Sequence, residues 1–100
     1  METMEKDWHF FIAIAEEGNM TKAANRLYIS QPALSYRLQQ LEKQFNKPLF
    51  IRTSRGVTLT ETGELYYHYA LDMLHRKREF ENTLSNYGDE ITGTFRLGVS

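Results

Sequence analysis

The stretch that decides the fold runs from Ser30 to Leu41 and reads SQPALSYRLQQL. Leu34, Leu38, Leu41 and Phe45 recur at the spacing of one apolar face of a helix. We therefore predict that this segment is a helix whose leucines and final phenylalanine face the protein core.

Both ends of this helix are marked by local signals. The hydroxyl of Ser30 can accept a hydrogen bond from a free amide of the first turn, which makes Ser30 a good N-cap. Pro32 falls in that first turn, where a missing N–H costs little. Asn46 is expected to end the helix, so the predicted bounds are Gln31 and Phe45.

The outward face of this helix carries small, amidic or flat groups and no acid. A glutamine can pair with adenine through two hydrogen bonds, a serine can contact several bases, and proline and tyrosine can touch thymine methyls. The alternative is an ordinary solvated surface, on which these residues would contact only water. The candidate base contacts are Gln31, Pro32, Ser35, Tyr36 and Gln39.

Two shorter helices are predicted before this one, over about residues 5–17 and 21–27. Gly18 and Asn19 end the first helix, since both residues tolerate the left-handed conformation that closes helices. The predicted inward positions are Trp8, Phe11, Ile12 and Ala15 in the first helix, and Ala23, Ala24 and Leu27 in the second. Two helices, a tight connection and a third helix are typical of a helix-turn-helix.

After Pro48 the pattern changes to two short β-like runs, residues 49–52 and 57–60, on either side of the turn-like TSRG. This predicts a hairpin, which would make the helix-turn-helix a winged one. Arg52, Ser54 and Arg55 could enter a minor groove, where the potential is most negative. The alternative is a plain hairpin tip, which also favours Ser, Gly and Arg.

A long helix follows, capped by Thr60 and extending to about Tyr87. At 1.5 Å per residue it would be roughly 40 Å long, more than a domain of this size needs. Its apolar residues would pair with a second copy of the chain; the alternative is a helix lying across its own domain. The candidate dimerisation residues are Leu65, Tyr66, Tyr69, Ala70, Met73, Leu74, Phe80 and Leu84.

The charge of the 100-residue chain is unevenly distributed, although the net value is only −1. Residues 1–20 have a net charge of −4, residues 21–60 have seven basic residues and one acid, and residues 61–100 have a net charge of −3. A basic segment between acidic flanks is the footprint expected for phosphates. The candidate phosphate contacts are Thr21, Lys22, Arg26 and Arg37, with Lys43 and Lys47 as weaker candidates.

Other functions find little support in the sequence. His68, Asp72 and His75 share a helix face and could hold a metal, but a solvated face is the favoured interpretation. Cysteine is absent, no paired base suggests nucleophilic catalysis, and no apolar run approaches the length of a membrane span. We expect no enzyme activity, no catalytic residue, no metal, no cofactor and no membrane association, and we expect a cytoplasmic protein.

The run from AEEGN through TKAANRL and SQPALSYRLQQLE to PLFIRTSRGVTLTETG strongly resembles the N-terminal DNA-binding domain of LysR-type transcriptional regulators. The resemblance covers residues 4 to about 87. It implies a mainly α fold, a winged helix-turn-helix of three helices and a two-stranded wing followed by a long linker helix. The implied division is 1–60 for the DNA-binding domain, 61–88 for the linker and dimerisation helix, and 89–100 for a hinge and the start of a truncated effector-binding domain.

The resemblance also implies how such a domain works. It implies sequence-specific, dimeric binding of double-stranded DNA at the nucleoid, with base contacts from Gln31, Pro32, Ser35 and Tyr36 and with arginines on the wing. Relatives often have arginine at position 36, so the tyrosine here favours a methyl or stacking contact. A small-molecule co-inducer would bind only the missing C-terminal domain, and tetramer formation stays open. The alternatives are a winged-helix module that binds protein and a non-specific DNA-binding protein.

Overall fold

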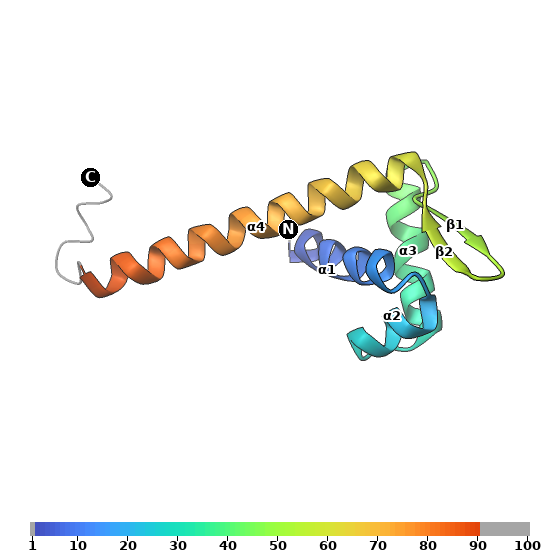
Figure 1. The fold of residues 1–100 in the computed structure, drawn as a ribbon, viewed down its shortest axis with the longest axis horizontal. Helices are drawn as coiled ribbons and strands as arrows, with labels where there is room; N and C mark the ends of the chain where they lie inside the picture. The colour runs from blue at the N-terminus through green and yellow to red at the C-terminus, as the bar shows by residue number, and fades with distance from the viewer. Residues whose placement is uncertain (1, 91–100) are drawn as a thin grey trace.

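The structure is a computed structural model that describes residues 2–90, with side chains from residue 5 to residue 87. It confirms the predicted architecture of three helices, a two-stranded antiparallel wing and a long helix (Figure 1). The elements are α1 (Glu2–Glu17), α2 (Met20–Leu27), α3 (Gln31–Phe45), β1 (Phe50–Thr53), β2 (Gly56–Leu59) and α4 (Glu61–Glu90). Residues 91–100, which make up most of the predicted hinge and start of an effector-binding domain, lie outside the described residues.

The ends of the helices follow from short-range hydrogen bonds. Ser30 caps α3, because its Oγ accepts a hydrogen bond from the amide of Ala33 at 3.2 Å. Asn46 ends α3 in the left-handed conformation, with φ of 57°. Gly18 ends α1 with φ of 64°, as predicted, but Asn19 has a different role. It is extended and caps α2 through a 2.8 Å hydrogen bond from the amide of Lys22.

The core lies where α1 meets α2, α3 and the base of the hairpin. Leu34, Leu38 and Leu41 of α3 are buried, as are Ala23 and Ala24 of α2, which confirms the inward positions predicted for these five residues. The fully buried large side chains are Phe11, Ile14, Leu34 and Leu49. The core cluster is Phe10, Phe11, Ala13, Ile14, Met20, Ala23, Ala24, Leu34, Leu38, Leu41, Leu49, Phe50 and Val57.

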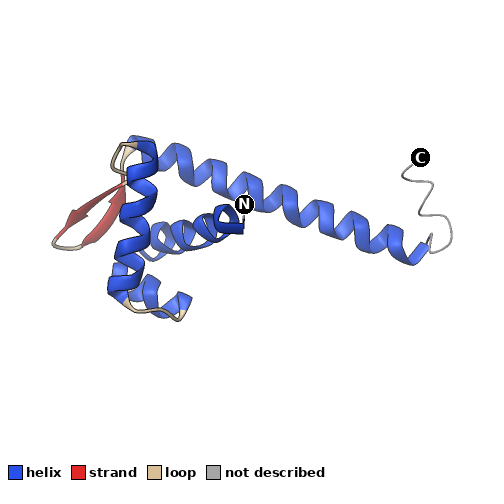
Figure 2. Ribbon diagram, turned by 180° about the vertical axis from the view of Figure 1, so that it is seen from behind, coloured by secondary structure: helices blue, strands red, loops and turns tan. Residues whose placement is uncertain are grey.

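The predicted inward positions of α1 cover only part of its buried surface. Phe10, Ala13 and Ile14 are buried in addition to Phe11 and Ile12, whereas Trp8 is only half-buried. The reason is visible in Figures 1 and 2, where α1 lies between α4 on one side and α2 and α3 on the other. A helix covered on several sides buries residues that a periodicity analysis assigns to solvent.

The hairpin is held to the body by contacts with two distant segments. Its strands pair with Thr53 opposite Gly56, so both strands lie about one residue from the predicted bounds. The amide of Val57 donates to the carbonyl of Gly18 at 3.1 Å. Gly56 has φ of +140°, and a Cβ at this position would lie 2.2 Å from the Gly18 carbonyl oxygen. The wing therefore docks on the turn between α1 and α2, and glycine is required at that contact.

Glu42 fastens the other end of the hairpin. One oxygen of its carboxylate accepts hydrogen bonds from the amides of Leu49, at 2.7 Å, and Phe50, at 3.2 Å. Thr60 Oγ1 donates to the carbonyl of Pro48 at 2.8 Å and accepts from the amide of Gly63 at 2.9 Å. The same threonine thus closes the hairpin and caps α4, which confirms its predicted cap role.

The long helix has a proximal half that packs on the body and a distal half that projects beyond it (Figures 1 and 2). It continues to Glu90, three residues past the predicted end. Ala70 is fully buried within its own chain, and Tyr66 packs against the core. Phe45 was predicted to face inward but is 39% exposed, because it is the last residue of α3. One side of its ring lies against Tyr66, with 5.2 Å between the two ring centroids.

Candidate nucleic-acid interface

The polar face of α3 forms a ridge on the surface of the body. We use the name polar ridge for Gln31, Pro32, Ser35, Tyr36 and Gln39. Pro32, Tyr36 and Gln39 are exposed, while Gln31 and Ser35 are half-buried. No acid belongs to this set, and its members lie along the N-terminal two-thirds of a helix whose opposite face is packed in the core. The ridge therefore offers donors, acceptors and apolar edges to a partner without repelling a polyanion.

The wing stands beside this ridge and makes one direct contact with it. Arg52 Nη2 donates to Ser35 Oγ at 3.3 Å. At the tip, Thr53 Oγ1 accepts from the amide of Arg55 at 3.1 Å and donates to the carbonyl of Gly56 at 3.3 Å. These bonds shape the tip that presents Ser54 and Arg55, both of which are exposed. The two arginines thus have different positions: Arg52 reaches back to α3, and Arg55 lies at the tip.

A polar cleft of about 250 Å³ separates the wing from α2 and the start of α3. The first turn of α2, with Thr21, borders it on one side, and the two wing arginines border it on the other. A helix N-terminus has free amides and a positive dipole end, and guanidinium groups pair well with phosphate oxygens. The cleft is lined by Asn19, Met20, Thr21, Gln31, Arg52, Thr53, Ser54, Arg55, Gly56 and Val57.

The basic residues of residues 21–60 differ in how far their charge is already paired. Arg26 contacts the carboxylates of Glu16 at 2.9 Å and Glu17 at 3.2 Å, and its hydrogen bond to Glu16 is the main cause of its raised pKa. Arg37 lies over the Phe10 ring, 5.3 Å from the centroid. Both side chains therefore turn toward α1. Their predicted phosphate contacts stay predictions.

Other cations of this segment have no carboxylate partner among the described side chains. Within the described side chains, Lys22, Arg52 and Arg55 have no carboxylate within 4.0 Å. The only acid of residues 21–60 is Glu42, and its carboxylate is engaged by two backbone amides at the base of the hairpin. The sequence contained a signal for this role, a single acid in a basic segment, but sequence reasoning missed it. The result is a surface with uncompensated positive charge beside the polar ridge.

The apolar residues predicted for dimerisation fall into two groups. Ala70 is covered by its own chain, and Tyr66, Met73 and Leu74 are half-buried. The others are exposed, including Leu65 at 73% and Phe80 at 62%. We use the name α4 stripe for this exposed group together with Tyr87, which is also exposed but was not among the predicted residues; the stripe is Leu65, Tyr69, Phe80, Leu84 and Tyr87.

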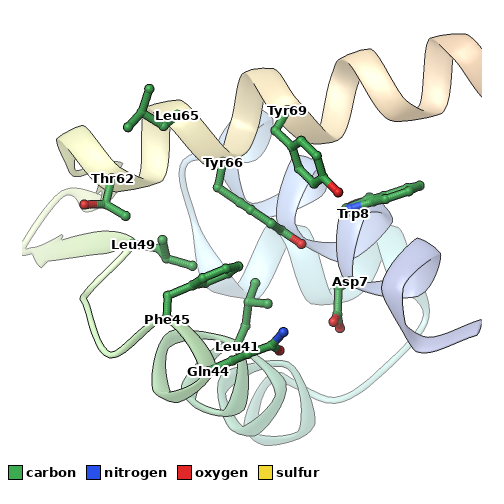
Figure 3. A pocket seen from close by; sticks show the side chains of 10 residues that line it. All are labelled: Asp7, Trp8, Leu41, Gln44, Phe45, Leu49, Thr62, Leu65, Tyr66 and Tyr69. Atoms are coloured by element: carbon green, nitrogen blue, oxygen red, sulfur yellow. The ribbon is translucent and has the colours of Figure 1, made fainter. Parts of the chain in front are cut away.

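An apolar groove of about 470 Å³ adjoins the proximal end of this stripe (Figure 3). Its walls come from α1, α3 and α4, and it shares Leu65 and Tyr69 with the α4 stripe. Burial is the main cause of the raised pKa of Tyr66, and of the raised pKa of Asp7, which Arg37 partly offsets. The lining is Asp7, Trp8, Leu41, Gln44, Phe45, Leu49, Thr62, Leu65, Tyr66 and Tyr69.

The residues of α4 that the sequence offered as possible metal ligands include His75 and Asp72, and each of these two lies beside an ion-pair partner. His75 lies 3.3 Å from Glu79, and Asp72 pairs with Arg76 at 3.0 Å. Across the described residues, no group of three or more His, Cys, Asp or Glu side chains is placed to hold a metal ion. None of the described helices combines the length and the apolar character that a membrane crossing requires.

Comparison with known proteins gives a consistent result. Residues 6–64 match the family described as bacterial regulatory helix-turn-helix protein, lysR family. The chain is 41% identical over 96 residues to the HTH-type transcriptional regulator YraN of Bacillus subtilis (strain 168), covering 96% of this chain and 33% of that protein. It is 37% identical over 91 residues to the nitrogen assimilation regulatory protein nac of Escherichia coli (strain K12), covering 91% of this chain and 30% of that protein.

Solved structures agree with the sequence relatives. A crystal structure of a BenM_DBD/benA site 1 DNA complex has a TM-score of 0.79 and 33% identity, covering 84% of this chain and 94% of that one. A crystal structure of a CbnR_DBD–DNA complex has a TM-score of 0.73 and 34% identity, covering 82% of this chain and 95% of that one.

Proposed function

Because the chain belongs to the lysR family of bacterial regulatory helix-turn-helix proteins, we propose that it is the DNA-binding domain of a transcriptional regulator and that it binds specific DNA sequences as a dimer. The polar ridge of α3 enters the major groove and reads base edges, while the wing tip reaches the adjacent minor groove. The matched family and the relatives described above are regulators and not enzymes.

The observation that carries this proposal is an acid-free polar ridge beside cations that have no carboxylate partner among the described side chains. Thr21 of α2, Gln31 of the ridge and the two wing arginines border one polar cleft, and Lys22 is exposed next to Thr21. Phosphate contacts from such cations set the position of a helix in the groove, and the ridge then supplies specificity. Both solved structures described above are complexes with DNA, which supports DNA as the partner of this chain.

The chain spans about a third of the length of the curated relatives it matches. We propose that residues 1–60 form the DNA-binding domain, that residues 61–88 form the linker and dimerisation helix, and that residues 89–100 lead into a further domain. That domain would bind a small-molecule co-inducer, and the regulator would act on the chromosome in the cytoplasm. A tetramer would need contacts from outside the described residues.

We propose that the dimer forms through the α4 stripe. Phe80 and Leu84 belong to the distal half of the helix, which projects beyond the body and has no cover there from the described chain. Apolar side chains in a row on a long helix are buried most simply by a second copy of the same helix. Two copies would present two ridges to two half-sites, spaced by a whole number of helical turns of DNA.

The test is a binding measurement with one disruptive substitution and one matched control. Ser35→Glu places a carboxylate on the polar ridge, where it would repel phosphates and pair with Arg52, so specific binding should be lost. Ser85→Glu makes the same chemical change on the exposed distal part of α4 and should leave binding to DNA intact. Binding is measured by fluorescence anisotropy with a duplex selected from a random pool, at two salt concentrations.

Two results would contradict the proposal. One is unchanged affinity of Ser35→Glu for the selected duplex, which would remove α3 from the major groove. The other is an affinity that is insensitive to salt, because a protein that neutralises phosphates must weaken as salt rises. Circular dichroism of both variants checks that the helical content is the same.

A further inference from the structure

The sequence patterns of α3 and of the hairpin did not predict the hydrogen bond between the wing and α3. Sequence reasoning placed Arg52 with Arg55 as a minor-groove contact. In the structure Arg52 is one position from the end of β1, opposite Val57, and its guanidinium reaches Ser35 in the middle of the polar ridge. This places a guanidinium on the major-groove side of the wing rather than at its tip.

This contact sets the hydrogen-bonding character of Ser35. A serine hydroxyl has one donor and two acceptor sites. One acceptor site of Ser35 is occupied by Arg52, and the described residues include no acceptor for the Ser35 hydroxyl proton. A positive charge at 3.3 Å also disfavours the approach of a base amino group, which carries positive partial charge. Ser35 is therefore prepared to donate a hydrogen bond to a base rather than to accept one.

Arg52 offers donors of the same kind to the same place. A guanidinium has five N–H donors, and Ser35 uses one of them. The described structure contains no carboxylate partner for the others. Two neighbouring donor groups require two neighbouring acceptors. In the major groove guanine presents two acceptors, N7 and O6, whereas adenine and cytosine each present an amino donor and thymine pairs one acceptor with a methyl group.

We propose that Arg52 and Ser35 form a joint reader of guanine in the major groove, with Arg52 acting both as a direct donor and as the residue that orients the Ser35 hydroxyl. This inference rests on the proposed function, since it assigns a base preference to the surface that is proposed to enter the groove. It separates the roles of the two wing arginines: Arg52 belongs to base recognition, and Arg55 to the tip.

The experiment selects bound sequences from a duplex pool with a randomised central region, using the 100-residue chain, three test variants and one control variant. Arg52→Met removes the donors and the charge, Ser35→Ala removes the hydroxyl, and the third variant combines both changes. Lys22→Met is the matched control, because it removes one open positive charge from α2 without touching α3. The parent should select guanine at one position of each half-site. The preference of Arg52→Met for guanine over the other bases at that position should be about tenfold weaker than that of the parent. Adding Ser35→Ala should weaken the preference little further.

Replacement of the selected guanine by 7-deazaguanine gives a second readout. The modified base lacks the N7 acceptor, so the parent should bind it less tightly, whereas Arg52→Met should bind both duplexes equally. Lys22→Met should weaken binding to all duplexes by the same factor and keep the preference. The inference is overturned if Arg52→Met also weakens binding uniformly and keeps the parent's base preferences. A parent that selects no sequence at all would overturn the proposed function, and this inference with it.

Discussion

Substitution of Gly56 by alanine tests whether the wing is held to the turn between α1 and α2. Gly56 has φ of +140°, a conformation that residues with a side chain rarely adopt, and its substitution costs about 1–3 kcal/mol on that ground alone. The new Cβ would also lie 2.2 Å from the Gly18 carbonyl oxygen, so β2 must move away. That movement would break the Val57–Gly18 hydrogen bond, worth about 0.5–1.5 kcal/mol net. We expect a total loss of about 1.5–4.5 kcal/mol in the free energy of unfolding.

Gly18→Ala is the matched control for this substitution. Gly18 also has a positive φ, +64°, but the nearest atom to its added Cβ is the Val57 carbonyl oxygen at 3.8 Å, an ordinary contact. Its cost is therefore only the left-handed strain of about 1–2 kcal/mol. Urea denaturation followed by far-UV circular dichroism, at one protein concentration, gives both values. A Gly56→Ala loss no larger than that of Gly18→Ala would show that the wing is not docked as described.

Three further substitutions probe other parts of the molecule. Glu42→Ala should lower the free energy of unfolding by about 2–5 kcal/mol, because it leaves two backbone amides at the base of the hairpin without an acceptor. The control is Lys43→Ala, which removes an exposed neighbouring side chain. In the same urea experiment it should change the free energy of unfolding by less than about 0.5 kcal/mol. Asp7→Asn should stabilise the protein at pH 7, since burial raises the pKa of Asp7 above its ordinary 3.8 and the ionised form is disfavoured in the folded state. The parent then gains stability as the pH falls through the pKa of Asp7 in the folded state. The melting temperatures of parent and variant should therefore converge near pH 3. A difference in melting temperature that does not change with pH would contradict the burial of Asp7 as the cause. Arg55→Ala should weaken DNA binding by about 1–3 kcal/mol if the tip enters the minor groove, and an affinity equal to that of the parent would leave the tip as scaffold.

The sequence predicted the features that depend on neighbouring residues. Ser30, Asn46 and Thr60 were each assigned their helix-end roles, because a cap is formed within three or four residues of chain. The leucine face of α3 was predicted for the same reason, since helical periodicity is local. These signals were sufficient for the order of the elements and for a fold of three helices, a wing and a long helix.

The sequence could not predict contacts between segments that are distant along the chain. The burial of Phe10 and Ile14 depends on how α2, α3 and α4 surround α1, and the exposure of Phe45 depends on where α4 crosses the end of α3. Arg26 was predicted from its place in a basic segment to contact phosphate, but folding brings it to two glutamates of α1. The Arg52–Ser35 bond likewise joins residues seventeen positions apart. Such pairings follow from the tertiary arrangement rather than from composition or period.

The uncovered distal half of α4 has a consequence for how the protein responds to its own abundance. The apolar stripe that ends in Leu84 and Tyr87 is exposed within the described chain, and the proposed dimer would cover it. If the proposed dimer is the species that occupies DNA, occupancy at low abundance follows mass action with second order in monomer. A twofold rise in expression would then increase occupancy by about fourfold, which makes gene dosage itself a steep control on the regulator.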